Sequence, residues 1–159
     1  MQKMIVDGYN VLHADPDLKQ MIRRDLQEAR RILVRRLTEY LGDRRVQVTL
    51  VFDGRGGLTD VDVEIPGKLQ VLYSAAGQTA DEVIVGILER SDSPRRFIVV
   101  TSDMADIGRT ARAMGAGLLS SRDFLTRIQP AAAPDEPADG ETPVDLDYWL
   151  KQFGQEEEP

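Results

Sequence analysis

Short apolar runs alternate with segments of helical periodicity along the first 130 residues. Apolar, β-branched runs typical of strands lie at residues 3–7, 46–52, 69–73 and 97–101, with a weaker one at 117–120. Between them, apolar residues recur three and four positions apart at 25–41 and 80–90, and more loosely at 104–114. This alternation predicts an α/β fold of three layers, α/β/α, in which helices cover both faces of a mainly parallel, Rossmann-like central sheet.

The pattern changes after Ile128, where proline, alanine and acidic residues replace the apolar runs. We therefore expect a folded domain at 1–129, a disordered, semi-extended linker at 130–143 and a short helix with an acidic tail at 144–159. The helix is predicted because four apolar residues have the spacing of one helical face: Leu146, Trp149, Leu150 and Phe153. Its apolar face either docks on the folded domain or binds a groove of a partner.

Composition restricts the chemistry that the chain can perform. The sequence has no cysteine, which excludes disulfides, thiol nucleophiles and cysteine-bound zinc. Its single histidine, His13, excludes mechanisms that need a histidine pair, and we expect it to be a loop or packing residue. The remaining candidates for catalysis are mostly oxygen donors, which favour hard divalent cations.

The acidic net charge of −7 comes from the C-terminal segment. Nine acids and one lysine follow residue 130, which leaves 19 bases and 18 acids in the first 130 residues. A polyanionic substrate is therefore compatible with the folded domain. No apolar run reaches the roughly 18 to 20 residues of a membrane helix, and the N-terminal MQKMIVDGYN lacks the order of a signal peptide. We expect a cytoplasmic protein with no membrane partner.

Acidic residues follow three of the predicted strands. Asp7, Asp53 and Asp103 come at or just after strand ends, and Asp81 begins the helix predicted at 80–90. The carboxyl ends of parallel strands and the starts of the following helices share one edge of a sheet, so these carboxylates are expected to converge. Converging carboxylates repel each other unless a cation neutralises them, which predicts a divalent metal site.

Each acid also has a purely structural interpretation. Asp7 and Asp53 precede glycines, as is common in turns. Thr79 and Glu82 fit a capping box, so Glu82 is interpreted as structural. Asp103 has the alternative role of N-cap for the next helix.

Polar and basic neighbours of the acids are candidates for holding a substrate. Three residues after Asp7, the Asn10 amide is placed to orient a water or a phosphate oxygen, and Thr101 and Ser102 offer hydroxyls that bind phosphate or order the acids. Further candidates for substrate binding are Arg55 and Lys68 as phosphate contacts and Tyr9 as a stacking surface. The alternatives are a solvated loop charge for Arg55 and core packing for Tyr9.

The motifs VDGYNVLHA, VFDG, G-x-TADE at 77–82 and VVTSD, in this order, resemble the YacP-like branch of the NYN domains, which are relatives of the PIN-type nucleases. The resemblance spans about residues 3–128. It implies a PIN-like α/β/α fold and a ribonuclease that holds Mg²⁺ or Mn²⁺ on a small set of acids.

The resemblance also implies roles for individual residues. Asp7, Asp81 and Asp103 match the metal-binding acids, with Asn10 beside the first of them. Asp53 matches the VFDG position, nearer the rim of the site. Asp106 is either an outer ligand or a charge in the first turn of its helix.

Together with the acids at the strand ends, the resemblance implies a Mg²⁺- or Mn²⁺-dependent endoribonuclease. Water attack on RNA would leave 5′-phosphate and 3′-hydroxyl ends, in the processing or decay of mRNA or of ribosome-associated RNA. The expected partners are RNA and the ribosome. The alternative is a non-cleaving RNA- or ribosome-binding module that uses the same acidic crevice. A phosphorylation-switch domain would need a lysine where Ser120, Ser121 and Arg122 stand, and a small-molecule phosphatase would need an acid in place of Tyr9.

Overall fold

The computed structural model describes residues 2–54 and 65–129 of the chain. The predicted linker and C-terminal helix, residues 130–159, lie outside the described residues. Within the described ranges, no helix has the length and apolar character needed to cross a membrane.

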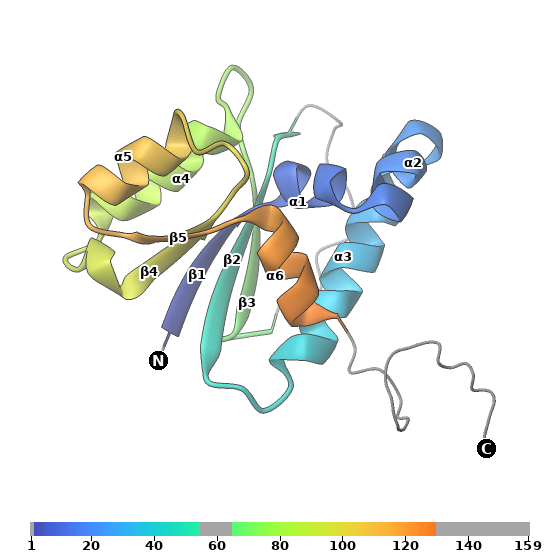
Figure 1. Cartoon of the computed structure of the whole chain (residues 1–159), viewed down its shortest axis with the longest axis horizontal. Coiled ribbons are helices and arrows are strands. Elements are labelled where there is room, and N and C mark those ends of the chain that lie inside the picture. The colour runs from blue at the N-terminus through green and yellow to red at the C-terminus, as the bar shows by residue number, and fades with distance from the viewer. Residues whose placement is uncertain (1, 55–64, 130–159) are drawn as a thin grey trace. The chain divides into compact units, whose positions relative to one another are not determined.

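Five parallel strands form one sheet (Figure 1). In chain order they are β1 (Gln2–Asp7), β2 (Val46–Phe52), β3 (Leu69–Tyr73), β4 (Phe97–Val100) and β5 (Gly117–Leu119). Across the sheet their order is β3-β2-β1-β4-β5, so the first strand lies at the centre. Every predicted strand is present, and its bounds differ from the prediction by at most about one residue at either end. The predicted parallel α/β architecture is therefore confirmed.

Helices occupy most of the remaining described residues. They are α1 (Gly8–Ala14), α2 (Pro16–Arg24), α3 (Leu26–Leu41), α4 (Ala80–Arg90), α5 (Ile107–Ala113) and α6 (Ser121–Ile128), with a 3₁₀ turn η2 (Pro94–Arg96) before β4. Periodicity predicted α3, α4 and α5. It missed α1, α2 and α6 because seven to nine residues are too few to establish a helical period. A local signal did mark α2, where Asp15 caps the helix and Pro16 occupies its first turn.

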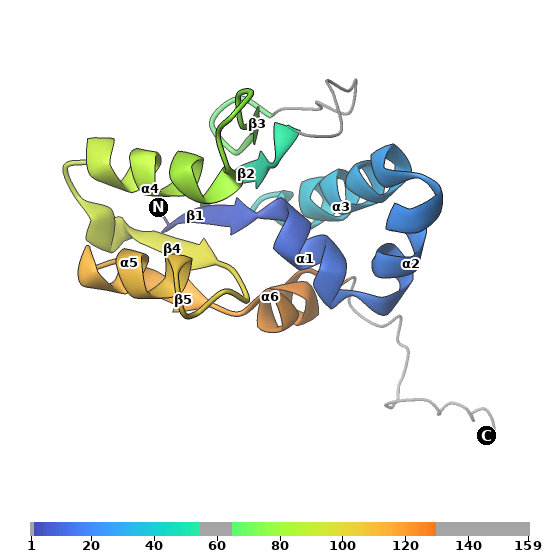
Figure 2. The same ribbon diagram turned by 90° about the horizontal axis from the view of Figure 1, so that it is seen from above.

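The helices form a layer on each face of the sheet (Figure 2). In both views α4 and α5 lie toward the left of the picture, and α1, α2, α3 and α6 lie toward the right. Two apolar cores result. Met4 and Val6 of β1 pack in the core under α1, α3 and α6, whereas Ile5 packs in the core under α4 and α5. The central strand is thus buried on both faces, as its continuous apolar sequence predicts.

The first helix follows β1 without a loop, and this junction requires glycine. Asp7 ends β1, and Gly8 begins α1. A Cβ atom at residue 8 would lie 2.5 Å from a ring carbon of Phe52 and 3.0 Å from the carbonyl oxygen of Val51. Only a residue without a side chain allows α1 to approach β2 this closely. The same junction sets the position of Asp7.

We expect Gly8→Ala to lower the free energy of unfolding by about 1–3 kcal/mol, because the added methyl group would force the Phe52 ring or the α1 backbone to shift. Urea unfolding followed by circular dichroism measures the change. Gly86→Ala in α4 is the matched control, since its Cβ would meet only the guanidinium of Arg90, at 3.2 Å. Alanine there should raise stability by up to about 1 kcal/mol. Equal destabilisation by both variants would contradict the assignment of Gly8.

Candidate active site

The ends of β1 and β4 form the centre of the candidate site. The two strands are neighbours, with Val6 beside Val100 in register. The chain leaves them toward opposite faces of the sheet, since α1 packs in one core and α5 in the other. Open parallel sheets bind ligands at such a switch point, beyond the carboxyl ends of the strands. The fold therefore brings Asp7 and residues 101–103 to the place where this class of sheet offers a site.

Asp7 is a buried carboxylate, with 4% of its surface exposed. The Asn10 side chain donates a hydrogen bond from Nδ2 to Asp7 Oδ2 at 2.8 Å. Burial raises the pKa of Asp7 to about 6, and the negative charge of Asp81 adds to the increase, although hydrogen bonds from Asn10 and Thr101 act in the opposite direction. At neutral pH the carboxylate is therefore ionised in an environment that disfavours its charge.

Asn10 connects the ends of β1 and β4. Its Oδ1 accepts a hydrogen bond from the Ser102 N–H at 3.0 Å, while its Nδ2 donates to Asp7. The amide oxygen and the amide nitrogen thus both have protein partners, and Asn10 holds the Asp7 carboxylate in place relative to the loop after β4. The predicted contact of Asn10 with a water or a phosphate stays a prediction.

The loop after β4 is ordered by its own side chains. Thr101 is fully buried, and its hydroxyl accepts a hydrogen bond from the Asp103 N–H at 3.0 Å. Asp103 Oδ1 in turn accepts from the Asp106 N–H at 3.0 Å. Asp106 is the N-cap residue of α5 but makes no capping hydrogen bond with its side chain. Of the two predicted hydroxyl residues, Thr101 has the ordering role, and Ser102 is exposed at the surface of the site.

Asp81 enters the site from the first turn of α4. The predicted capping box is present: the Thr79 hydroxyl accepts from the Glu82 N–H at 3.1 Å, and the Glu82 carboxylate accepts from the Thr79 N–H at 3.0 Å. Glu82 is therefore structural, as predicted. Burial raises the pKa of Asp81, and the charges of Asp103 and Asp106 raise it further.

Asp81 is electrostatically coupled to each of the other three acids of the site, and among the described residues no ion pair joins any of the four to a basic side chain. Asp81 raises the pKa of Asp7, while Asp103 and Asp106 raise that of Asp81, so all four share one electrostatic environment. Ion pairs within the described part of the chain join Arg31 to Glu28 and Arg36 to Asp15, away from these acids. We call Asp7, Asp81, Asp103 and Asp106 the acidic rim.

The acidic rim is looser than a closed metal cage. In residues 2–54 and 65–129, no three acidic or histidine side chains lie close enough together to enclose a metal ion. Mg²⁺ typically binds through one or two carboxylates, keeps several waters and takes further oxygen ligands from substrate phosphates. The all-oxygen donor set of the rim, with mutual repulsion among its carboxylates, fits this mode of binding.

A groove of about 420 Å³ adjoins the acidic rim between α4 and α5. Asp81 and Asp106 line it from the two helices, together with Glu82 and Glu89 of α4. Its surface is mainly acidic where it meets the rim, so it suits a cation or water rather than the anionic part of a substrate.

Asp53 lies at the end of β2, next to β1 in the sheet, and is half-buried. Its carbonyl oxygen accepts a hydrogen bond from Arg30 Nη2 at 3.3 Å. Arg30 was missed in the sequence, although it is 1% exposed and its guanidinium lies 5.2 Å from the Phe52 ring centre. Its position on the apolar stripe of α3, four residues after Leu26 and three before Leu33, was the available signal.

The other residues predicted to contact substrate are Tyr9, Arg55 and Lys68, and the structure describes two of them. Tyr9 is half-buried on α1, and its ring centre lies 5.0 Å from that of His13, which is exposed in the last turn of the same helix. Arg55 lies outside the described residues. The prediction that Lys68 lies beside the acids was wrong. Lys68 directly precedes β3, at the amino ends of the strands, whereas the acids lie at the carboxyl ends. Its ammonium group donates a hydrogen bond to the Gly42 carbonyl oxygen. Lys68 precedes its strand, and the strands are parallel, so it cannot share an edge with the strand-end acids.

We expect the ionisation of Asp7 to lower the free energy of unfolding of the metal-free protein as the pH rises from 4 to about 6.5. The folded state binds the proton more tightly than the unfolded state in this window, because burial raises the pKa from 3.8 to about 6. Asp7→Asn should therefore be more stable than the wild type at pH 7, by roughly 2–3 kcal/mol, and this difference should vanish below pH 4. Urea unfolding in EDTA across this pH range measures it.

Asp15→Asn is a control, because it should lower the stability of the protein at pH 7 where Asp7→Asn should raise it. Burial alone would raise the pKa of Asp15, but hydrogen bonds from Arg36 and from the Leu18 N–H lower it below the usual value. The Asp15 carboxylate thus stabilises the fold above pH 4, and its stabilising contribution fades as the pH falls through the lowered pKa. Loss of stability at pH 7 in both variants would refute the burial of an unneutralised charge at Asp7.

The chain resembles known proteins in sequence. The sequence model of the YacP-like NYN domain matches residues 4–141. Over 132 residues the chain is 28% identical to the "Uncharacterized protein YacP" of Bacillus subtilis strain 168. The matched region covers 81% of this chain and 76% of that protein.

It also resembles solved structures. Two crystal structures of Rae1 (YacP) from Bacillus subtilis, one of them of a mutant, superpose on it with TM-scores of 0.66 and 0.67. Their sequence identities are 28% and 27%, and the matches cover 80% of this chain and 75% and 74% of theirs. The chain therefore belongs to the YacP-like NYN domain family, a family of PIN-like nuclease domains, and has its parallel α/β fold.

Proposed function

We propose that the protein is a Mg²⁺- or Mn²⁺-dependent endoribonuclease that leaves 5′-phosphate and 3′-hydroxyl ends. Membership of the family supports nuclease activity in general. The finer proposal rests on Asp7, a buried carboxylate at the switch point of the sheet that Asp81 repels. A divalent cation would remove the unfavourable free energy of that charge and stabilise the acidic rim.

The residues of the rim have separate roles in this proposal. When bound, the divalent cation would lower the pKa of a water and neutralise charge on the scissile phosphate. Asp7, Asp81 and Asp103 would hold it, directly or through water, with Asp53 and Asp106 farther out. Asn10 and Thr101 keep the Asp7 carboxylate oriented through their hydrogen bonds. The exposed Ser102 hydroxyl is placed to donate a hydrogen bond to a phosphate oxygen.

Water is the nucleophile in this proposal. The metal-free route through the RNA 2′-hydroxyl commonly uses two histidines as acid and base, and the chain has His13 alone, exposed at the end of α1. Attack by water breaks the bond to the 3′ oxygen, which accounts for the proposed ends. With 19 bases and 18 acids in its first 130 residues, the protein should bind naked RNA modestly, so the ribosome remains the predicted partner.

We expect the wild-type protein to cut a single-stranded RNA with Mn²⁺ or Mg²⁺, and Asp7→Asn and Asp81→Asn each to slow cutting by at least about 100-fold, since each removes a proposed ligand. Gel analysis of a 5′-labelled RNA gives the rate. A 5′-phosphate-dependent exonuclease identifies the new ends. Circular dichroism verifies that the variants are folded.

Asp92→Asn is the matched control for cutting, because Asp92 is an exposed acid before β4, at the opposite edge of the sheet. It should cut at the wild-type rate. Wild-type cutting by Asp7→Asn, or full activity in excess EDTA, would refute the proposal. Binding of RNA without any cutting would favour the non-cleaving alternative.

Metal binding has a readout that does not depend on activity. At pH 7.5 we expect saturating Mn²⁺ to raise the melting temperature of the wild type by roughly 10 °C, since a ligand at about 100 times its Kd stabilises by about 2.7 kcal/mol. Asp7→Asn should show little of this increase, and Asp92→Asn all of it. Differential scanning fluorimetry with Ca²⁺-free buffers measures the shift. The same shift in Asp7→Asn would place the ion elsewhere.

A further inference from the structure

A second groove, of about 480 Å³, is lined by Met104, the residue after Asp103 of the acidic rim, and by residues of α5. Its full lining is Met104, Gly108, Arg109, Arg112, Ala113 and Leu118. We call it the α5 groove. Met104 directly follows Asp103, and the Gly108 N–H donates to the Asp103 carbonyl oxygen at 2.9 Å. The α5 groove is thus tied to the loop that carries one acid of the rim.

The start of the α5 groove exposes an apolar surface. Met104 is 45% exposed and is the exposed large hydrophobic residue of the described part of the chain. A Cβ at Gly108 would lie 3.3 Å from the Met104 sulfur and 3.4 Å from a methyl carbon of Leu118, so the three residues form one continuous floor. A thioether is polarizable and adapts to the flat face of an aromatic ring, such as that of a nucleobase.

The wall of the α5 groove carries two cations. Arg109 and Arg112 are exposed and stand three residues apart, on the same side of α5. Neither guanidinium pairs with an acid within the described residues, and no acidic residue lines the α5 groove. Their spacing along the helix axis, about 4.5 Å, is comparable with the 3.4 Å between stacked nucleotides of one strand. The groove thus combines an apolar floor with free positive charge.

We propose that the α5 groove binds the single-stranded RNA next to the bond that is cut, with one unpaired base against Met104 and Leu118 and neighbouring phosphates on Arg109 and Arg112. The inference rests on the proposed ribonuclease function for the identity of the ligand. It extends that function by assigning RNA binding to the α5 groove and the cutting reaction to the acidic rim. The acidic rim repels phosphates in the absence of a metal ion, whereas the α5 groove attracts them.

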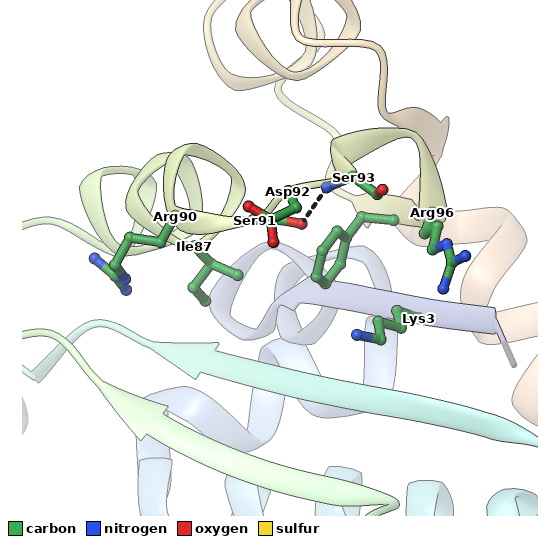
Figure 3. Close-up of a pocket in the computed structure, with 8 residues that line it drawn as sticks. Lys3, Ile87, Arg90, Ser91, Asp92, Ser93 and Arg96 are labelled. Atoms are coloured by element: carbon green, nitrogen blue, oxygen red, sulfur yellow. Dashed lines mark hydrogen bonds between the residues drawn. The ribbon is translucent and has the colours of Figure 1, made fainter.

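A pocket of similar size at the other edge of the sheet serves as the comparison (Figure 3). It also measures about 480 Å³, but Asp92 lies among its cations, and Figure 3 shows Arg90 and Arg96 at opposite ends of it. Lys3 lines it at the start of β1, four residues and about 13 Å along the strand from Asp7. This pocket has no continuity with the acidic rim, so its Arg96 provides a matched control.

The test measures RNA affinity in EDTA, where no cutting occurs. The probe is a fluorescent 12-nucleotide oligouridylate, followed by anisotropy at several salt concentrations. The double variant Arg109→Ala/Arg112→Ala should raise Kd at least about tenfold at low salt and reduce the slope of log K against log salt by about 1.4, the value for two lost phosphate contacts. Met104→Ala should raise Kd about threefold without changing this slope, because it removes an apolar contact.

Arg96→Ala should keep Kd within about twofold of the wild type, although Arg96 is an exposed arginine as Arg109 and Arg112 are. An RNA duplex of mixed sequence should show no effect of Met104→Ala, since its bases are paired. Unchanged affinity in the double variant, or an equal loss in Arg96→Ala, would overturn the proposal.

The outcome also separates the two proposals. Loss of binding in the arginine variants together with undiminished cutting by Asp7→Asn would refute the catalytic proposal and support the α5 groove. Wild-type binding by the arginine variants together with inactive Asp7→Asn would overturn the groove and leave the catalytic proposal standing. Asp7→Asn itself should bind the probe in EDTA at least as tightly as the wild type, because it removes a negative charge.

Discussion

The buried charge of Asp7 is the constraint on which the site depends. β1 is the central strand, held by β2 on one side and β4 on the other, so its last residue cannot move toward water. The carboxylate is kept there by hydrogen bonds from Asn10 and Thr101, while burial and Asp81 oppose its ionisation. A scaffold that holds an unfavourable charge in a fixed place lowers its own stability, and the proposed divalent cation would remove this cost.

Hydrogen bonds between distant segments give this site its rigidity. The Asn10 amide joins α1 to the loop after β4, across 92 positions of sequence. Within that loop, the contacts from Thr101 to Asp103 and from Asp103 to Asp106 leave little freedom for the acids to separate. The close approach of Gly8 to Phe52 fixes the start of α1. The geometry of the acids is therefore set by the backbone around them and not by their mutual repulsion.

Charge is divided between neighbouring surfaces. The acidic rim lies at the carboxyl ends of the strands, where helix N-termini favour negative charge. Arg109 and Arg112 follow along α5, and Lys3, Lys68 and Arg96 lie at the amino ends of the strands. In the proposed function, a nearly neutral domain would bind a polyanion on one surface and hold a metal ion on another, which requires the two surfaces to adjoin. The α5 groove meets this condition through the loop of Asp103 and Met104.

The sequence by itself determined the strands, the longer helices, the capping box of α4 and the presence of acids at strand ends, because periodicity and turn chemistry are local properties. Only the tertiary structure decided which of these residues meet. The parallel direction of the strands placed Lys68 at their amino ends, packing buried Arg30 against the rings of Phe52 and Tyr73, and the pairing of β1 with β4 brought Asn10 to Ser102. Distances among the acids depend on strand order and helix packing together, which no local pattern encodes, and for this reason the open form of the rim could not be foreseen.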